Sequence, residues 1–277
     1  MYIMPVRSPA VAGRFYPGTA AEVSAAIAQL YPSRPGPGRD AVAVMCPHAG
    51  WMFSGKLAAR TLAEVHVPER VVVLCPNHTG LGARVAVFPT GAWRVPGGDA
   101  IIDEELASFL LQEAQGVRGC RADAEAHAFE HSIEVLLPLL MARQPSLRLV
   151  PVVLGGLSTD ECVAFGEALS RAIERVDEHV LVVASSDMSH YLPEAETRRR
   201  DEAALAALVT GDPALLADAV ARHDVSMCGV RPACAMLGYA RRVGAAKPEL
   251  VGYTTSGEAF GDYSQVVGYA GVVVPTA

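Results

Sequence analysis

The chain has 277 residues, of which 51% are hydrophobic and 19% charged, a composition typical of a globular protein. Its formal net charge is -7 and its only basic run, residues 198–200, is short, so we expect no nucleic-acid partner. No apolar run reaches the roughly 18 residues that a membrane-spanning helix needs, and the first residues do not resemble a signal peptide. We therefore expect a cytoplasmic protein that does not bind membranes.

Short, almost continuous apolar runs predict buried β-strands. Four such strands are expected over residues 41–47, 71–76, 147–156 and 179–190. Weaker patterns predict an exposed strand and loop over 84–98 and two closing strands over 249–258 and 264–274. Runs that are apolar along their whole length are typical of strands covered on both faces.

Helical periodicity separates these strands. Helices are expected over residues 20–31, 54–65, 103–114, 127–144, 158–176, 198–211, 213–223 and 229–244. Thr19, Ser54, Asp103 and Ser158 stand where N-caps are needed, and Pro138 should kink or restart its helix. The alternation predicts one α/β domain over residues 1–277, with a mostly parallel or mixed central sheet and helices on both faces.

Two of the predicted strands end in nearly the same way. VAVMCPHAG (residues 42–50) and VVVLCPNHTG (71–80) each run an apolar strand into Cys-Pro, followed by His48 or His78. If the two strands are neighbours, both imidazoles reach the same edge of the sheet, where α/β proteins gather ligands. Imidazole suits Zn, Fe, Cu and Ni, so the pair is a candidate metal site. The alternative is two loop histidines with structural hydrogen bonds.

A third strand end carries ASSDMSH, residues 184–190. Asp187 precedes His190 by three residues and could accept a hydrogen bond from its ring, which would make His190 a candidate general base. The alternative is that Asp187 is a helix cap and His190 incidental.

HAFEHSIE, residues 127–134, contains the H-x-x-E-H pattern of inverted zinc proteases. On a helix, His127 and His131 would face the same way and could hold zinc while Glu130 activates water. The string is short enough to occur by chance, so a metal-assisted hydrolase is a lesser alternative.

The six cysteines form no CxxC pair, and we interpret them as reduced thiols, not as a disulfide framework. Cys228, followed by Gly229, is a candidate metal ligand or redox nucleophile, or a small buried side chain. The interpretation as small buried side chains is the better one for Cys120, Cys162 and Cys234.

Seven segments, read in order, resemble one family. They are VAGRFYP, PHAGWMFSG, PNHTG, EHSIEVLLPLL, SSDMSH, CGVRP and YTTSGE, spread between about residues 7 and 274. Together they resemble the MEMO family, whose bacterial and archaeal members are called AmmeMemoRadiSam system protein B. Each motif alone is weak, but seven in the same order are specific.

The resemblance implies an α/β fold like that of class III extradiol dioxygenases, non-haem Fe(II) enzymes that cleave catechol rings. Carried over, it implies His48, His78 and Cys228 as metal ligands and His190 with Asp187 as the acid/base pair. It places His131 in the pocket as a substrate contact. This chain departs from the eukaryotic pattern at Asn77, because the eukaryotic members carry another histidine at this position. It also carries Cys46 and Cys75 before the two prolines, where we expect other small or apolar residues. We expect these two cysteines to line the pocket near the metal.

The resemblance and the residues support two main hypotheses for the function. The first is a metal-dependent oxidoreductase that binds Fe(II), with Cu or Zn as alternatives. Its substrates would be O2 and a small organic molecule, for example an aromatic one. The second is a non-catalytic protein that binds a metal or peptide in the same pocket. Trp51, Phe53, Trp93 and Tyr191 are candidate pocket-lining residues. The oligomeric state is not predicted.

Overall fold

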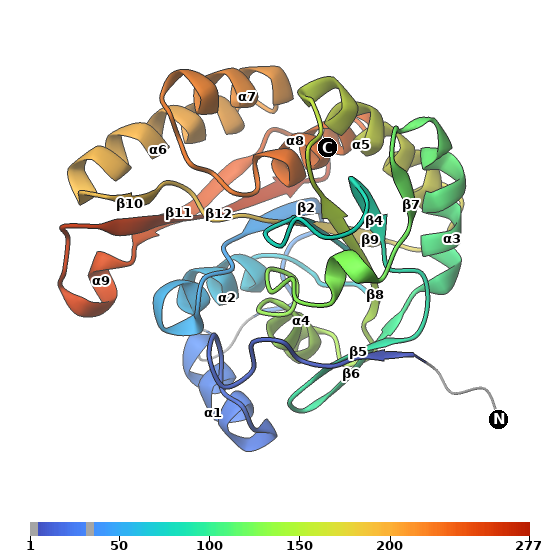
Figure 1. Cartoon of the computed structure of the whole chain (residues 1–277), viewed down its shortest axis with the longest axis horizontal. Coiled ribbons are helices and arrows are strands. Elements are labelled where there is room, and N and C mark those ends of the chain that lie inside the picture. Colours follow the sequence, from blue (N-terminus) through green and yellow to red (C-terminus); the bar gives the residue numbers. More distant parts are fainter. Residues whose placement is uncertain (1–4, 32–35) are drawn as a thin grey trace.

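A computed structural model describes residues 5–31 and 36–277. Within these residues twelve strands join one mixed sheet that crosses the molecule (Figure 1). The strands are β1 (Val6–Arg7), β2 (Ala41–Cys46), β3 (Arg70–Pro76), β4 (Val85–Val87), β5 (Ala92–Val95), β6 (Gly98–Ile102), β7 (Cys120–Ala122), β8 (Arg148–Leu154), β9 (Val180–Ser185), β10 (His190–Leu192), β11 (Glu249–Thr255) and β12 (Val266–Pro275).

The main path of the sheet runs β1-β5-β6-β8-β3-β9-β2-β12-β10, with β11 beside β12 and β4 between β7 and β8. The four central strands β8, β3, β9 and β2 are parallel to one another. β12 continues the sheet antiparallel to β2, and β5 and β6 pair antiparallel toward the other edge. The predicted mixed sheet is therefore confirmed, and its parallel centre directs four carboxyl ends to the same edge.

Helices cover both faces of this sheet, as predicted. They are α1 (Ala20–Leu30), α2 (Lys56–Ala63), α3 (Glu104–Glu113), α4 (Leu137–Arg143), α5 (Thr159–Ile173), α6 (Glu194–Leu208), α7 (Pro213–Arg222), α8 (Val230–Arg242) and the short α9 (Gly257–Phe260). The described residues also contain the π-helix η1 (Trp51–Gly55) and the short 3-10 helices η2 (Ala114–Gly116) and η3 (Glu125–His127). Figure 1 shows α1, α2 and α4 on one side of the sheet and α3 and α5 to α8 on the other.

The central strands are apolar along their length because both of their faces are covered. In β3, Val72 and Leu74 belong to the core beneath α3, α5 and α8, whereas Val71 and Val73 belong to the core beneath α2 and α4. Successive side chains of a strand point to opposite faces, so each strand supplies both cores.

Three of the four predicted caps are confirmed. Thr19, Asp103 and Ser158 accept hydrogen bonds from the first turns of α1, α3 and α5, and Ser158 forms a reciprocal capping box with Glu161. Ser54 is no cap, because it lies within η1 and its hydroxyl donates to the carbonyl oxygen of Ala49.

The helix predicted over 127–144 is wrong before residue 137, whereas its predicted restart at Pro138 is confirmed. Only Leu137–Arg143 is α-helical, and Pro138 lies in its first turn, where a missing N–H costs nothing. The preceding residues bend because Glu130 accepts hydrogen bonds from the backbone N–H groups of His131 and Ser132. The strand predicted over 84–98 is present as β4 and β5, but its predicted exposure is wrong, since β4 and Trp93 are fully buried.

None of the helices in residues 5–31 and 36–277 combines the length and the apolar character required to cross a bilayer.

Candidate metal centre

The carboxyl ends of β2, β3 and β9 bring three loops together. β9 lies between β2 and β3 and is parallel to both, so β2 and β3 are not direct neighbours. His48 follows β2, His78 follows β3, and Asp187 with His190 follows β9. The expected meeting of His48 and His78 still occurs, because the loops after the two outer strands converge over the end of β9.

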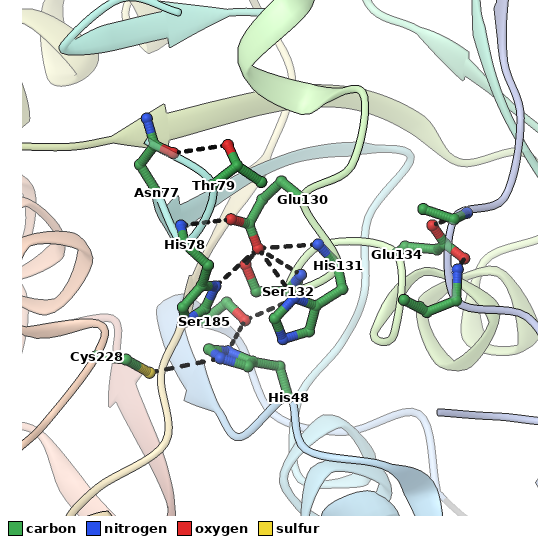
Figure 2. A network of polar contacts seen from close by, with 12 residues as sticks. His48, Asn77, His78, Thr79, Glu130, His131, Ser132, Glu134, Ser185 and Cys228 are labelled. Carbon is green, nitrogen blue, oxygen red and sulfur yellow. Dashed lines mark hydrogen bonds and ion pairs between the residues drawn. The ribbon is translucent and has the colours of Figure 1, made fainter. Parts of the chain in front are cut away.

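Three histidines form the centre of the site: His48, His78 and His131. One ring nitrogen from each lies within 4.8 Å of the other two, a spacing at which one metal ion could bind all three. The ring centroids are 5.3 Å apart for His48 and His78, 5.5 Å for His48 and His131, and 4.7 Å for His78 and His131. Figure 2 shows the three histidine side chains close together.

The tautomer of His48 follows from its hydrogen bonds. The hydroxyl of Ser185 donates to the carbonyl oxygen of Ser132 at 2.8 Å. Its oxygen must therefore accept from Nδ1 of His48, 2.7 Å away. A neutral imidazole with a proton on Nδ1 carries its lone pair on Nε2. Ser185 thus orients His48 with a free ligand atom toward the other two rings.

His78 is held by a buried carboxylate. Glu130 accepts from the backbone N–H of His78 at 2.7 Å through Oε2 and from Nδ1 at 2.9 Å through Oε1. Because a carboxylate only accepts, Nδ1 carries the proton and Nε2 is free. A carboxylate behind a histidine is the usual outer partner of a metal ligand, and it makes the free nitrogen more basic.

His131 joins this group from the bend before α4. Its backbone N–H also bonds to Oε1 of Glu130, at 2.9 Å, and its ring packs against Phe15 with centroids 4.8 Å apart. The resemblance implied a substrate contact here, whereas the structure groups His131 with the two other histidines. The feature of the sequence that could have indicated this is Glu130 beside it, because Glu130 accepts hydrogen bonds from both His131 and His78.

Cys228 lies beside the three histidines. Its Sγ is 3.4 Å from Nε2 of His48, and the backbone N–H of Asp187 points to the sulfur at 3.2 Å. A Cβ added to Gly229 would lie 2.4 Å from the carbonyl oxygen of Ser185, so glycine at 229 lets Cys228 approach β9. Burial raises the pKa of the Cys228 thiol, which favours the neutral form in the absence of a cation.

Asp187 does not hold the ring of His190, contrary to our prediction. Its Oδ1 accepts from the backbone N–H of His48 at 2.8 Å, which fixes the loop after β2 instead. Ser226 takes the predicted place, because its Oγ accepts from the backbone N–H of His190 and its carbonyl oxygen accepts from Nδ1 at 3.0 Å. No sequence pattern pointed to Ser226, which lies 36 residues from His190.

Burial acts differently on the titratable groups of the site, and it favours the neutral form of two of the three histidine rings. Burial lowers the pKa of His48 well below its usual value, with further lowering from His131 and His78, and burial also lowers the pKa of His131. For His78, burial opposes the charged form, but the hydrogen bond and charge of Glu130 outweigh it and raise the pKa. Burial raises the pKa of Asp187 to about 7.

The H-x-x-E-H string does not form a second metal site. His127 is fully buried, its Nε2 donates to the carbonyl oxygen of Ala86 and its ring packs on Phe88 and Trp93. Without a helix through 127–131, His127 and His131 point into different surroundings, so the predicted hydrolase site is wrong.

A cavity of about 870 Å³ opens above the three histidines. Its walls include His190, Cys228 and the aromatic rings of Phe15, Phe53, Tyr191, Phe260 and Tyr269. Phe53 and Tyr191 were predicted there, whereas Trp51 and Trp93 are buried in the core beneath α2 and α4. Cys46 and Cys75 are fully buried in that same core and do not line the cavity. All six cysteines are free.

Comparison with known proteins identifies the family of this chain. The sequence profile described as Memo-like protein matches residues 7–273. This chain belongs to the Memo family. It is 42% identical to a MEMO1 family protein of Methanopyrus kandleri over 96% of this chain and 98% of the relative. It is 38% identical to a MEMO1 family protein of Aquifex aeolicus over 98% and 99%.

The Memo fold of this chain is similar to that of a solved structure, an uncharacterized protein from Escherichia coli K12. The TM-score is 0.57 at 14% identity, over 84% of this chain and 98% of the other. At this identity the likeness shows the fold alone.

Proposed function

We propose that this Memo-family protein is a metal-dependent oxidoreductase of the non-haem iron type that acts on a small aromatic substrate with O2. The observation that supports it is the group of His48, His78 and His131 at the base of a cavity lined by aromatic rings. Imidazole nitrogens suit Fe(II), and they also suit Cu and Zn.

The residues present fit a metal ion. His48 and His78 each use Nδ1 in a hydrogen bond inside the protein, which leaves Nε2 free, and the cavity leaves room for further ligands. A bound Fe(II) with open positions would supply the one-electron chemistry that allows O2 to react with an organic molecule. Three protein ligands with open positions are the arrangement of catalytic sites, not of closed structural ones.

His190 is the proposed general base. Its Nδ1 proton is donated to the carbonyl oxygen of Ser226, so Nε2 carries the lone pair. Burial lowers the pKa of His190, which keeps the ring neutral and able to accept a proton near neutral pH. A phenolic hydroxyl in the cavity would give its proton to this nitrogen, and the aromatic side chains of the cavity would pack against the ring of the substrate.

The alternative is a binding protein without turnover. The contact between Sγ of Cys228 and Nε2 of His48 is the observation that favours it. If the thiolate became a fourth protein ligand, a tetrahedral metal such as Zn would have no open position for a substrate.

The test is O2 consumption by anaerobically purified protein loaded with Fe(II), measured with a panel of catechols. We expect turnover by the wild type, and its loss with retained Fe(II) in His190→Ala. The control is His179→Ala, because His179 lies at the amino end of β9, with Nε2 3.0 Å from the carbonyl oxygen of Ala41. Stoichiometric Fe(II) without any O2 uptake would refute the proposal in favour of the binding protein.

A further inference from the structure

Tyr191 has an unusual backbone conformation. Its φ angle is 59°, and Asp224 is the only other non-glycine residue in the described part of the chain with a positive φ. The left-handed region crowds the Cβ of an L-residue, and it is uncommon for bulky side chains. Asparagine and aspartate tolerate it better, so Tyr191 is the more strained of the two residues.

The strain arises from a bulge in the pairing of β10 with β12. His190 lies opposite Val267 and Leu192 opposite Val266, so Tyr191 is the extra residue between them. Such a bulge redirects the chain and is frequent beside functional sites. Glycine or asparagine would fill the same position at lower cost, so the bulge alone does not account for a tyrosine.

The fold gains little from the tyrosine ring. The residue is 72% exposed, and its hydroxyl has no hydrogen-bond partner among residues 5–31 and 36–277. Its ring lies at the mouth of the cavity, with its centroid 5.8 Å from that of His190. A strained residue whose side chain is largely exposed at a cavity is a candidate for contact with a ligand.

We propose that Tyr191 is a specificity-determining residue that presents its ring to a planar aromatic ligand in the cavity, beside His190. The inference rests on the proposed function and names the contact that selects its substrate. The edge-to-face pair of Phe53 and Phe260, with centroids 5.3 Å apart, supplies a second aromatic wall of the same cavity. Ring pairs of this kind are attractive beyond the area that they bury.

The experiment compares Tyr191→Asn with Tyr191→Phe. Asparagine tolerates the left-handed backbone and removes the ring, whereas phenylalanine keeps both the ring and the strain. The probe is 2-naphthol, whose fluorescence reports its Kd on metal-free protein, so the result does not depend on redox chemistry. We expect Tyr191→Asn to weaken binding by about 2- to 13-fold and Tyr191→Phe to stay within about 2-fold of the wild type.

Thermal melting of the same proteins separates ligand contact from a structural function. The Tm of Tyr191→Asn should equal or exceed that of the wild type, since the strain is relieved. A lower Tm with an unchanged Kd would overturn the inference, and so would a wild type that does not bind 2-naphthol. If binding falls as expected but Fe(II)-loaded protein consumes no O2, the Tyr191 contact stands and the proposed oxidoreductase fails.

Discussion

Glu130 holds His78 by two hydrogen bonds, from the backbone N–H at 2.7 Å and from Nδ1 at 2.9 Å. The same carboxylate accepts from the backbone N–H of His131 and from both the N–H and the hydroxyl of Ser132. Figure 2 shows it at the centre of the polar network behind the rings. One buried side chain therefore positions two of the three histidines.

Glu130→Gln should weaken metal binding by about 10- to 100-fold, because it removes the carboxylate behind His78. Anaerobic titration with Fe(II) measures the change. The control is Glu134→Gln, a buried carboxylate of the same segment that bonds Arg7, Tyr16 and two backbone N–H groups. Equal losses in the two variants, both verified as folded by circular dichroism, would show that Glu130 acts only through the fold.

His131→Ala should reduce Fe(II) affinity by more than about 100-fold, because loss of a direct ligand exceeds the loss of an outer partner. Cys228→Ala should have the smaller effect, since its sulfur lies near Nε2 of His48 without belonging to the three-histidine group. Metal titration of both variants decides between them. The reverse order would support Cys228 as the third ligand, as the resemblance implied.

Arg7→Met should lower the free energy of unfolding by about 3–5 kcal/mol, because it leaves the buried Glu134 without its cation. Arg7 also donates to the carbonyl oxygens of His127 and Glu130 and lies over the ring of Trp93. Urea denaturation measures the change. Arg94→Met, which breaks a mostly exposed pair with Asp99, should cost about 0–1 kcal/mol.

His127 should make stability depend on pH between about 4 and 6.5. Burial lowers its pKa to about 4 from the ordinary value of 6.5, so in this range the unfolded chain binds a proton that the folded chain excludes. Stability then falls as the pH falls, by about 2 kcal/mol from this residue between pH 6.5 and 5. Urea denaturation at both pH values should show a smaller loss in His127→Gln.

The control for this pH dependence is His223→Gln, because His223 is exposed. That variant should keep the pH dependence of the wild type. If His127→Gln and the wild type lose the same stability between the two pH values, the protonation of His127 does not couple to unfolding.

Joint replacement of Cys46 and Cys75 by alanine should leave Fe(II) stoichiometry unchanged. Both thiols are fully buried beneath α2 and α4 and neither lines the cavity. Metal analysis of the purified double variant checks this. A variant that folds but no longer retains Fe(II) would place at least one of these sulfurs in contact with the metal.

Local patterns in the sequence predicted most of the architecture. Strands covered on both faces must be apolar throughout, so β2, β3, β8 and β9 could be recognised without their neighbours. Helix caps are equally local, and Thr19, Asp103 and Ser158 act as their residue types suggest. The bend at 128–136 was missed, because it depends on the buried Glu130, which bonds the backbone of His131 and Ser132 beside it and of His78 in the loop after β3.

The sequence by itself determined that histidines follow the strand ends and that the chain resembles the Memo family. Only the tertiary structure decided which side chains meet. In it, β9 lies between β2 and β3, and Asp187 accepts a hydrogen bond from the backbone N–H of His48. His127 is buried in the core, whereas His131 lies beside His48 and His78. The physical reason is that side-chain direction in a loop follows from hydrogen bonds between residues far apart in sequence, as between Glu130 and His78, 52 positions away.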